Sequence, residues 1–306
     1  ILIVAGEPKS IFFEIFFKSL KLQKFKSPLI LISSLKIIRN QMKKFNFKKK
    51  IRELNFKNLN KENLNNKFIN VIDISHDNDM NYIHNCFKMA FKVLRSKFTN
   101  KFINGPIDKS TFLKKKYLGI TEFISHNFNK NKTAMLIYNK NLSVCPVTTH
   151  LPIKLVAKKI NLKIIKEKII LINNFYKKEL GFKPKIGVTG LNPHCETVLD
   201  INEDKEIVLA AINSMKKRKF KVKGPFPADT IFLKQNRVKF DVILGMYHDQ
   251  VLSPIKTLKE YDAINITLGL PFLRVSPDHG PNKKMINKNL SNPLSLVNSL
   301  KFLDKK

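Results

Sequence analysis

The segment that decides the fold is I-L-I-V-A-G-E-P-K-S-I-F-F-E-I-F-F (1–17). The five apolar residues at 1–5 have the length of a buried strand, the Gly-containing loop 6–10 turns the chain, and the apolar run 11–17 is predicted as a helix. A strand, a tight loop and a helix N-terminus in this order can hold an anion, although an ordinary strand–helix turn explains the segment equally well. The segment therefore predicts a strand–helix unit of an α/β fold.

Short apolar runs alternate with longer helical patterns along the rest of the chain. One helix is expected at 79–97, where apolar residues recur at helical spacing, and another at 152–180, which has Pro in its first turn and ends before Gly. Strands that alternate with helices indicate an α/β fold with a largely parallel core sheet. Further helices are expected at 203–217 and 293–303, and strands at 1–5, 28–33, 68–74, 101–104, 134–138, 142–148, 185–189, 241–246 and 264–268.

The composition is that of a folded globular protein. Of the 306 residues, 43% are hydrophobic and 10% aromatic, which argues against disorder. No apolar run reaches the roughly 18 residues that a membrane helix needs. The three cysteines, Cys86, Cys145 and Cys195, form no C-x-x-C pair, which is typical of free thiols in a reducing compartment. We therefore expect a cytoplasmic protein with no membrane partner.

The net charge of +34 comes from 57 Lys and Arg residues against 23 Asp and Glu. Such a charge attracts small phosphorylated substrates, and it is also typical of a nucleic-acid-binding protein. The basic stretches, such as 43–50, are mixed with Asn, Ile and Phe, which are the residues of A/T-rich codons. No RNP-like aromatic motif, C-x₂-C finger or Arg-rich arm accompanies the charge. Nucleic-acid binding is therefore kept as an alternative of another class, behind a small phosphorylated substrate.

Three histidines stand at the ends of apolar, strand-like runs, each in a short turn marked by Pro or Asp. They are His150 in V-T-T-H-L-P (147–152), His194 in G-L-N-P-H (190–194) and His248 in G-M-Y-H-D-Q (245–250). Imidazoles delivered from several strand ends can converge on one divalent cation, because ligands need only be close in space. Taken singly, each histidine is equally typical of a structural or surface position. Asp249 follows His248 directly and is placed to orient its ring or to reach the metal.

A second set of polar residues is suited to an anionic substrate. Lys256, Asn265 and Arg274 follow one another at intervals of nine residues. Two cations and an amide can grip a phosphate or carboxylate, which Arg can bind in bidentate fashion. In so basic a chain Lys256 and Arg274 can also be ordinary surface charges, but their surroundings are poor in lysine. His279 in S-P-D-H-G (276–280) is a candidate for contact with a cofactor.

These blocks, in order, resemble the 4-hydroxythreonine-4-phosphate dehydrogenase family. The resemblance covers nearly the whole chain and is most specific in G-P-F-P-A-D-T (224–230), Y-H-D-Q (247–250), N-I-T-L-G-L-P (265–271) and R-V-S-P-D-H-G (274–280). It implies a two-lobed α/β/α fold like that of the isocitrate and isopropylmalate dehydrogenases, with the active site in the interlobe cleft. It assigns 1–112 plus 254–306 to the first lobe and 113–253 to the second.

The resemblance also implies the cofactors and the residues that bind them. A divalent metal (zinc, magnesium or cobalt) is expected on His150, His194 and His248, one of them contributed across the interface of a homodimer. The expected substrate-binding residues are Thr121, Lys256, Asn265 and Arg274. NAD or NADP is expected at Asp278 and His279, without the G-x-G-x-x-G fingerprint or P-loop that the chain lacks.

The implied reaction is the oxidation and decarboxylation of 4-phosphohydroxy-L-threonine to 3-amino-2-oxopropyl phosphate, in pyridoxal 5'-phosphate (vitamin B6) biosynthesis. The metal acidifies the substrate hydroxyl, and Asp249 or Lys109 is the candidate proton acceptor. The chain departs from the family at Ile120, where a His is usual, and in the loops at 9–13 and 195–197. These departures leave open a sister dehydrogenase that acts on threonate or erythronate 4-phosphate.

Overall fold

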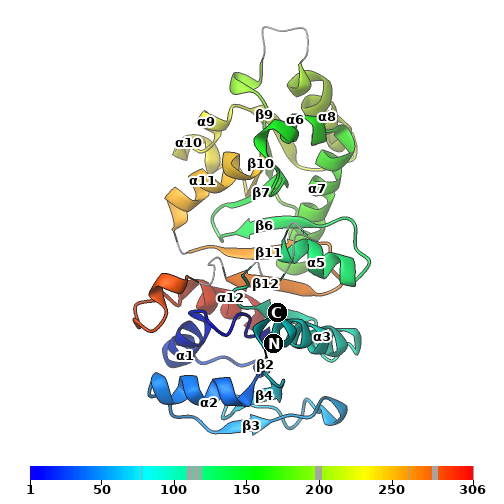
Figure 1. The fold of residues 1–306 in the computed structure, drawn as a ribbon. Coiled ribbons are helices and arrows are strands. Elements are labelled where there is room, and N and C mark those ends of the chain that lie inside the picture. The colour runs from blue at the N-terminus through cyan, green and yellow to red at the C-terminus, as the bar shows by residue number, and fades with distance from the viewer. Residues whose placement is uncertain are drawn as a thin grey trace. The chain divides into compact units, whose positions relative to one another are not determined.

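The chain forms two compact units, one made of residues 1–124 and 271–306 and the other of residues 125–270. The computed structural model describes residues 1–76, 78–108, 112, 117, 119–196, 202–260, 262–277 and 282–305. Each unit combines a sheet with helices, so the mixed α/β fold expected from the sequence is confirmed (Figure 1). None of the described helices is long and apolar enough to cross a membrane.

The first unit has a parallel sheet with the strand order β3–β4–β2–β1–β5–β12. Its strands are β1 (Leu2–Val4), β2 (Ile30–Ser33), β3 (Ile51–Glu53), β4 (Ile69–Asp73), β5 (Lys101–Asn104) and β12 (Leu273–Pro277). Its helices are α1 (Phe12–Leu22), α2 (Leu35–Lys44), η1 (Phe56–Asn58), α3 (Asp79–Arg95), η6 (Lys283–Met285) and α12 (Leu294–Asp304), and α5 (Ile120–Asn127) spans the boundary with the second unit.

The opening segment lies at the centre of this unit. Strand β1 pairs with β2 on one side and β5 on the other, and all three of its residues are fully buried, as expected for a parallel strand covered on both faces. The loop that follows passes very close to its neighbour, because Gly6 has φ of +82° and a Cβ there would lie 2.4 Å from the Pro106 carbonyl oxygen. The strand–helix unit predicted from residues 1–17 is thus confirmed.

The second unit has the strand order β11–β6–β7–β10–β8–β9, with antiparallel pairs β11/β6 and β6/β7 and parallel pairs elsewhere. Its strands are β6 (Ala134–Tyr138), β7 (Ser143–Thr148), β8 (Ile186–Thr189), β9 (Val222–Phe226), β10 (Val242–Tyr247) and β11 (Ile264–Leu268). Its helices are η2 (Ile153–Leu155), α6 (Val156–Lys159), α7 (Leu162–Phe175), η3 (Tyr176–Leu180), η4 (Pro193–Cys195), η5 (Asp204–Leu209), α8 (Ala210–Lys217), α9 (Ala228–Ile231), α10 (Lys234–Arg237) and α11 (His248–Lys259).

The single helix expected at 152–180 is wrong, because the chain breaks near residue 160. Ile160 has an extended backbone, with φ of −69° and ψ of 124°, and ends α6. Asn161 then begins a new helix, since its side chain accepts a hydrogen bond from the backbone N–H of Ile164 at 3.0 Å. A side-chain cap of this kind satisfies an N–H that the helix itself leaves without a partner.

The packing of α11 decides where the second unit ends. Val251, Leu252 and Ile255 of this helix are buried in one apolar cluster with Val144 of β7 and Ile243 of β10. The lobe boundary that we expected at 253/254 therefore falls inside a helix whose apolar face belongs to the second unit. The compact units meet at 124/125 and 270/271 instead.

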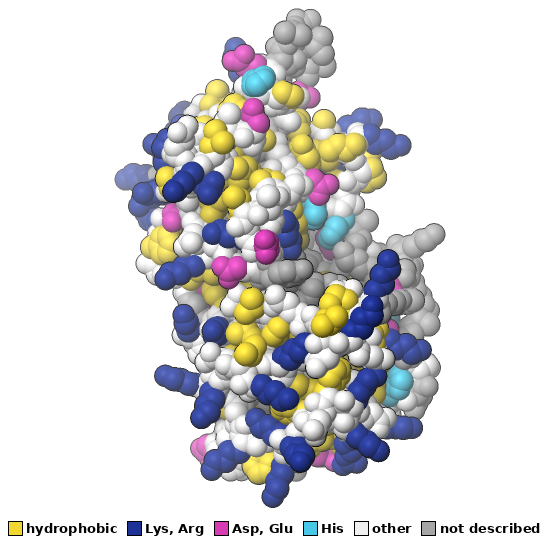
Figure 2. Space-filling model, turned by 90° about the vertical axis from the view of Figure 1, so that its left-hand side faces the viewer, with side chains coloured by type: hydrophobic (Ala, Val, Ile, Leu, Met, Phe, Trp, Pro, Cys, Tyr) yellow, Lys and Arg dark blue, Asp and Glu magenta, His cyan; other side chains and the backbone are white. Residues whose placement is uncertain are grey.

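Lys and Arg side chains are spread over both units rather than gathered in one stripe, as Figure 2 shows for one face of the molecule. This distribution matches a charge set by overall composition. With Lys and Arg spread in this way, positive charge alone does not distinguish a binding site from the rest of the surface, whereas burial and geometry do.

Candidate active site

The strand order of the second unit brings two of the three predicted metal ligands together. Strands β7 and β10 are parallel neighbours, with Thr148 opposite Tyr247, so their carboxyl ends meet at the same edge of the sheet. His150 follows β7 and His248 begins α11 directly after β10. Their ring centroids are 5.9 Å apart and the ring planes differ by 36°. Thr148 Oγ1 also donates to the Met246 carbonyl at 2.8 Å, which ties the two strand ends to each other.

Asp249 holds the ring of His248. The distance between His248 Nδ1 and Asp249 Oδ1 is 2.6 Å, and the two side chains are 37% and 79% exposed. A carboxylate on Nδ1 fixes the tautomer of the ring and leaves Nε2 as the nitrogen that faces a ligand. Of the three roles considered for Asp249, which are to orient the His248 ring, to reach the metal and to accept a proton, this contact is the one expected for orientation, and the other two stay predictions.

His194 lies on a separate, exposed loop of the same unit. Among the described residues, no three His, Cys, Asp or Glu side chains form a group that could hold a metal ion, so one chain brings together only two of the three histidines. His194 has a left-handed backbone with φ of 57°, and so does His150 with φ of 49°. Residues other than Gly seldom adopt this conformation, although His does so more often than most; nine other described non-Gly residues share it, so the conformation alone does not mark a ligand.

Hydrogen bonds with the half-buried Gln250 and the buried Asp204 fix the loop of His194. Gln250 Nε2 donates to the Gly190 carbonyl at 2.8 Å, and Gln250 Oε1 accepts from Thr189 Oγ1 at 2.8 Å. The Asp204 carboxylate, 1% exposed, accepts from the backbone N–H groups of Leu191 and Asn192. The sequence interpretation missed both side chains. Gln250 stands in the quoted Y-H-D-Q block, whereas no motif marked Asp204.

Lys256 and Asn265 belong to the same unit as the histidines. Lys256 is half-buried on α11, and burial lowers the pKa of its ammonium group. Asn265 lies on β11, and its Oδ1 is buried without a hydrogen-bond partner among the described residues. A buried polar atom left without a partner costs about 1–3 kcal/mol, so it is a natural position for a ligand contact.

Arg274 forms the centre of a second polar group, in the first unit. This side chain is only 1% exposed, and its Nε donates to Asn104 Oδ1 at 2.9 Å while its Nη1 donates to Thr121 Oγ1 at 3.0 Å. Burial lowers its pKa to about 10, an effect opposed by the carboxylate of Glu122, so it remains charged at neutral pH. Two predicted substrate residues are thus in direct contact. Asn104, in the quoted N-G-P-I-D-K block, is an additional member that the sequence interpretation missed.

Three predicted residues lie outside the described part of the chain: Lys109, Asp278 and His279. The assignment of Lys109 as a proton acceptor, and of the other two to the cofactor, stays a prediction.

A family model described as "Pyridoxal phosphate biosynthetic protein PdxA" matches residues 24–303. The chain belongs to the PdxA family. A 4-hydroxythreonine-4-phosphate dehydrogenase from Sulfurihydrogenibium sp. is 37% identical over 218 residues, which are 70% of this chain and 67% of that relative. Other curated relatives of the same name are matched over 58% and 49% of their length. These relatives carry the name of an oxidoreductase, so the family is one of enzymes.

Solved structures extend the likeness to almost the whole chain. A putative 4-hydroxythreonine-4-phosphate dehydrogenase from Salmonella typhimurium has a TM-score of 0.86 and 27% identity, and the match covers 99% of this chain and 98% of that one. A beta-decarboxylating dehydrogenase from Thermococcus kodakarensis has a TM-score of 0.50 and 10% identity over 98% of this chain and 80% of that one. The latter shows a shared fold, which is the dehydrogenase-like fold that the sequence predicted.

Proposed function

We propose that the chain oxidises and decarboxylates 4-phosphohydroxy-L-threonine to 3-amino-2-oxopropyl phosphate, with NAD or NADP as hydride acceptor and a divalent metal. Membership of the PdxA family supports the reaction class. The observation that carries the proposal is the pair of His150 and His248 at adjacent strand ends, with the Asp249 carboxylate bound to Nδ1 of His248.

The two imidazoles fit a divalent metal. Nitrogens bound to one ion at about 2.0–2.1 Å keep two ring centroids within roughly 6.5 Å of each other, and the observed separation is 5.9 Å. The third ligand would be His194 of the partner subunit in a homodimer, since this loop is exposed and does not join the pair within one chain. When bound, such a metal supplies a Lewis acid that acidifies the substrate hydroxyl. Zinc, magnesium and cobalt all suit this chemistry.

The chain's own residues would bind and orient the substrate. Arg274, held by Asn104 and Thr121, keeps a permanent charge where little water reaches it, which strengthens its attraction for a phosphate or carboxylate. Lys256 would bind a second anionic group, and Asn265 Oδ1 would accept a hydrogen bond from a substrate donor. Asp249 would orient His248, and Lys109 remains the proposed proton acceptor.

The test follows formation of reduced nicotinamide from 4-phosphohydroxy-L-threonine, with and without a chelator. We expect His150→Ala and His248→Ala to abolish both turnover and metal retention, while His126→Ala, on an exposed position of α5, retains both. Turnover that survives chelation, or metal retained by both site variants, would refute the proposed centre.

Ile120 supports a second candidate substrate. It begins α5 and directly precedes Thr121, the residue that accepts a hydrogen bond from Arg274, and it stands where the family usually has a His. Turnover of threonate or erythronate 4-phosphate without turnover of 4-phosphohydroxy-L-threonine would move the assignment to the sister activity.

A further inference from the structure

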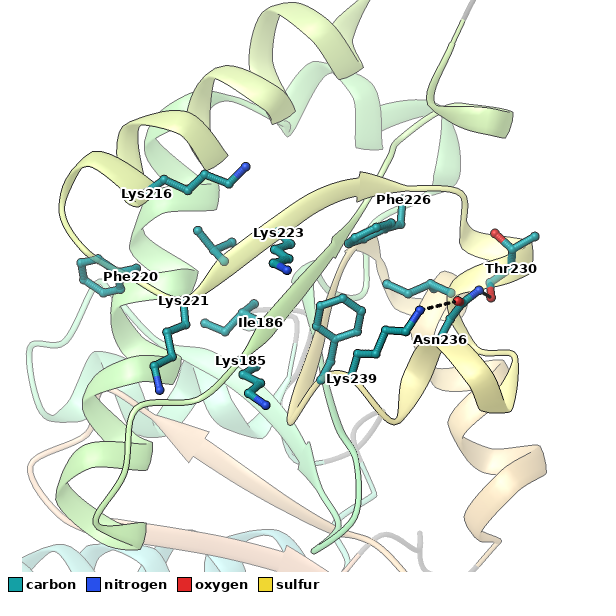
Figure 3. A pocket seen from close by; sticks show the side chains of 13 residues that line it. Lys185, Ile186, Lys216, Phe220, Lys221, Lys223, Phe226, Thr230, Asn236 and Lys239 are labelled. Carbon is teal, nitrogen blue, oxygen red and sulfur yellow. Dashed lines mark hydrogen bonds between the residues drawn. The ribbon is translucent and has the colours of Figure 1, made fainter.

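A groove of about 970 Å³ lies along the free edge of the sheet in the second unit (Figure 3). It contains none of the residues assigned above to metal, substrate or cofactor, so the proposed dehydrogenase activity does not account for it. Among the described residues, five lysines from four different parts of the unit line the groove and no acidic residue does. The lysines are Lys185, Lys216, Lys221, Lys223 and Lys239.

The floor of the groove is apolar and partly aromatic. Phe240 is 7% exposed and packs over the sheet, while the rings of Phe220 and Phe226 are half-buried and open to the groove. The absence of a side chain at Gly187 lets the Phe240 ring pack closely on strand β8, because a Cβ there would lie 3.0 Å from that ring. Lys223 is in register with Gly187 on the neighbouring strand, so its side chain emerges on the same face.

Protection of the sheet edge explains only some of the lysines in the groove. Strand β9 is the last in the sheet order, and lysines on such an edge discourage pairing with other chains. This explains Lys221 and Lys223, but not the other three, which come from different elements. None of the five forms an ion pair with another described residue, although Lys239 Nζ donates to Asn236 Oδ1 at 3.3 Å.

We propose that this groove binds a short stretch of single-stranded nucleic acid. Five cations exceed what one phosphate needs, and their spread along the groove suits a chain of phosphates. The Arg218 guanidinium lies 5.6 Å from the centroid of the Phe220 ring, and the Phe226 ring packs on Phe240 at 5.4 Å, so each ring has only its remaining exposed part on which a base can stack. A basic groove with aromatic surfaces is the usual arrangement for a strand bound without sequence preference. A second copy of this chain would set the same lysines against each other, and an acidic peptide would leave the rings uncovered.

The test measures fluorescence anisotropy of a labelled uridylate strand of about ten nucleotides, titrated with the 306-residue chain at several salt concentrations. The groove variant combines Lys185→Gln, Lys221→Gln and Lys223→Gln. The control variant combines Lys158→Gln, Lys159→Gln and Lys163→Gln, three exposed lysines of the same unit outside the groove. Both variants lower the net charge by three, so they separate the groove from the overall charge.

We expect the groove variant to bind about tenfold more weakly or worse and to lower the salt slope by about 2, at about 0.7 for each phosphate contact on a single strand. The control variant should stay within about twofold of the unchanged protein. Phe226→Leu, which keeps an apolar side chain on the floor, should weaken binding by about fivefold or more through lost stacking. Both lysine variants should retain the unfolding temperature and any dehydrogenase turnover, which separates this proposal from the proposed function. Phe226 also packs against the core of the second unit, so binding by Phe226→Leu is compared at a temperature where its circular dichroism shows it fully folded.

Several results would overturn the proposal. Equal losses in the groove and control variants would assign binding to net charge, and duplex binding as tight as single-strand binding would exclude base stacking. Displacement of the strand by polyglutamate at equal charge concentration would identify an acidic peptide as the occupant. Failure of the unchanged protein to bind the strand at low salt would exclude nucleic acid from the groove.

Discussion

Replacing Gln250 by alanine should loosen the loop that carries His194. The Gln250 side chain accepts from Thr189 Oγ1 at 2.8 Å and from the Met246 N–H at 2.7 Å, and it donates to the Gly190 carbonyl at 2.8 Å. Thr189 and Met246 are fully buried, so the alanine variant leaves polar groups of the strand ends without their partner.

The size of the effect follows from these three contacts. A hydrogen bond inside a protein contributes about 1 kcal/mol net, and leaving a buried partner unsatisfied costs about 1–3 kcal/mol. Gln250 is half-buried, so water can enter the vacated space and recover part of the loss. We therefore expect the free energy of unfolding to fall by about 2–4 kcal/mol. Gln235→Ala, at an exposed position of α10, is the matched control and should change it by less than about 0.5 kcal/mol.

Urea unfolding followed by circular dichroism measures the difference, since the chain has no tryptophan. Hydrogen exchange then shows whether the loosening is local: the amides of Leu191 and Asn192, which donate to Asp204, should exchange faster in the Gln250 variant. A loss below about 1 kcal/mol, or unchanged exchange at both amides, would refute the role given to Gln250.

Three further predictions concern Arg274 and Gly6 of the first unit and the buried thiol of Cys145. Arg274→Met should raise KM for the substrate by about 100-fold with a smaller effect on kcat, as expected for a lost charged contact; an unchanged KM in steady-state kinetics would contradict this role. Burial raises the pKa of the Cys145 thiol to about 12. The neutral thiol therefore contributes fully to the free energy of unfolding below about pH 9, and this contribution is lost as the pH rises toward 12. Cys145→Ala should make the free energy of unfolding, measured in urea, fall less between these two pH values. Gly6→Ala should lower the unfolding temperature by several degrees, because its φ is positive and its Cβ would meet the Pro106 carbonyl; an unchanged temperature would mean that the loop can move.

Much of the fold could be predicted because its strands are continuous apolar runs. The expected strands at 142–148 and 241–246 correspond to Ser143–Thr148 and Val242–Tyr247, with His150 and His248 just beyond them. Their proximity depends on β7 and β10 being neighbours, which no local pattern encodes. The break at Ile160 was missed because the side-chain cap of the next residue outweighs the apolar periodicity on either side.

The polar supports of the site were harder to predict than its ligands. Gln250 and Asp204 act through backbone groups that lie 60 and 12–13 residues away in the sequence. Such contacts exist only after the strands have assembled, so residue type and spacing carry no signal for them. Asn104 is a similar case, because its partner Arg274 is 170 residues away.

The discontinuous first unit has a consequence for how the protein is made. Residues 125–270 form one continuous compact unit, whereas the first unit needs both 1–124 and 271–306. On the ribosome, the unit made second can therefore complete its sheet before the one begun first. Until Leu273 emerges and pairs with Lys101, strand β5 lacks its neighbour on that side, and an unpaired strand edge is prone to aggregation. Arg274 lies on that strand, so the anion-binding group with Asn104 and Thr121 can assemble only after the whole second unit has been synthesised.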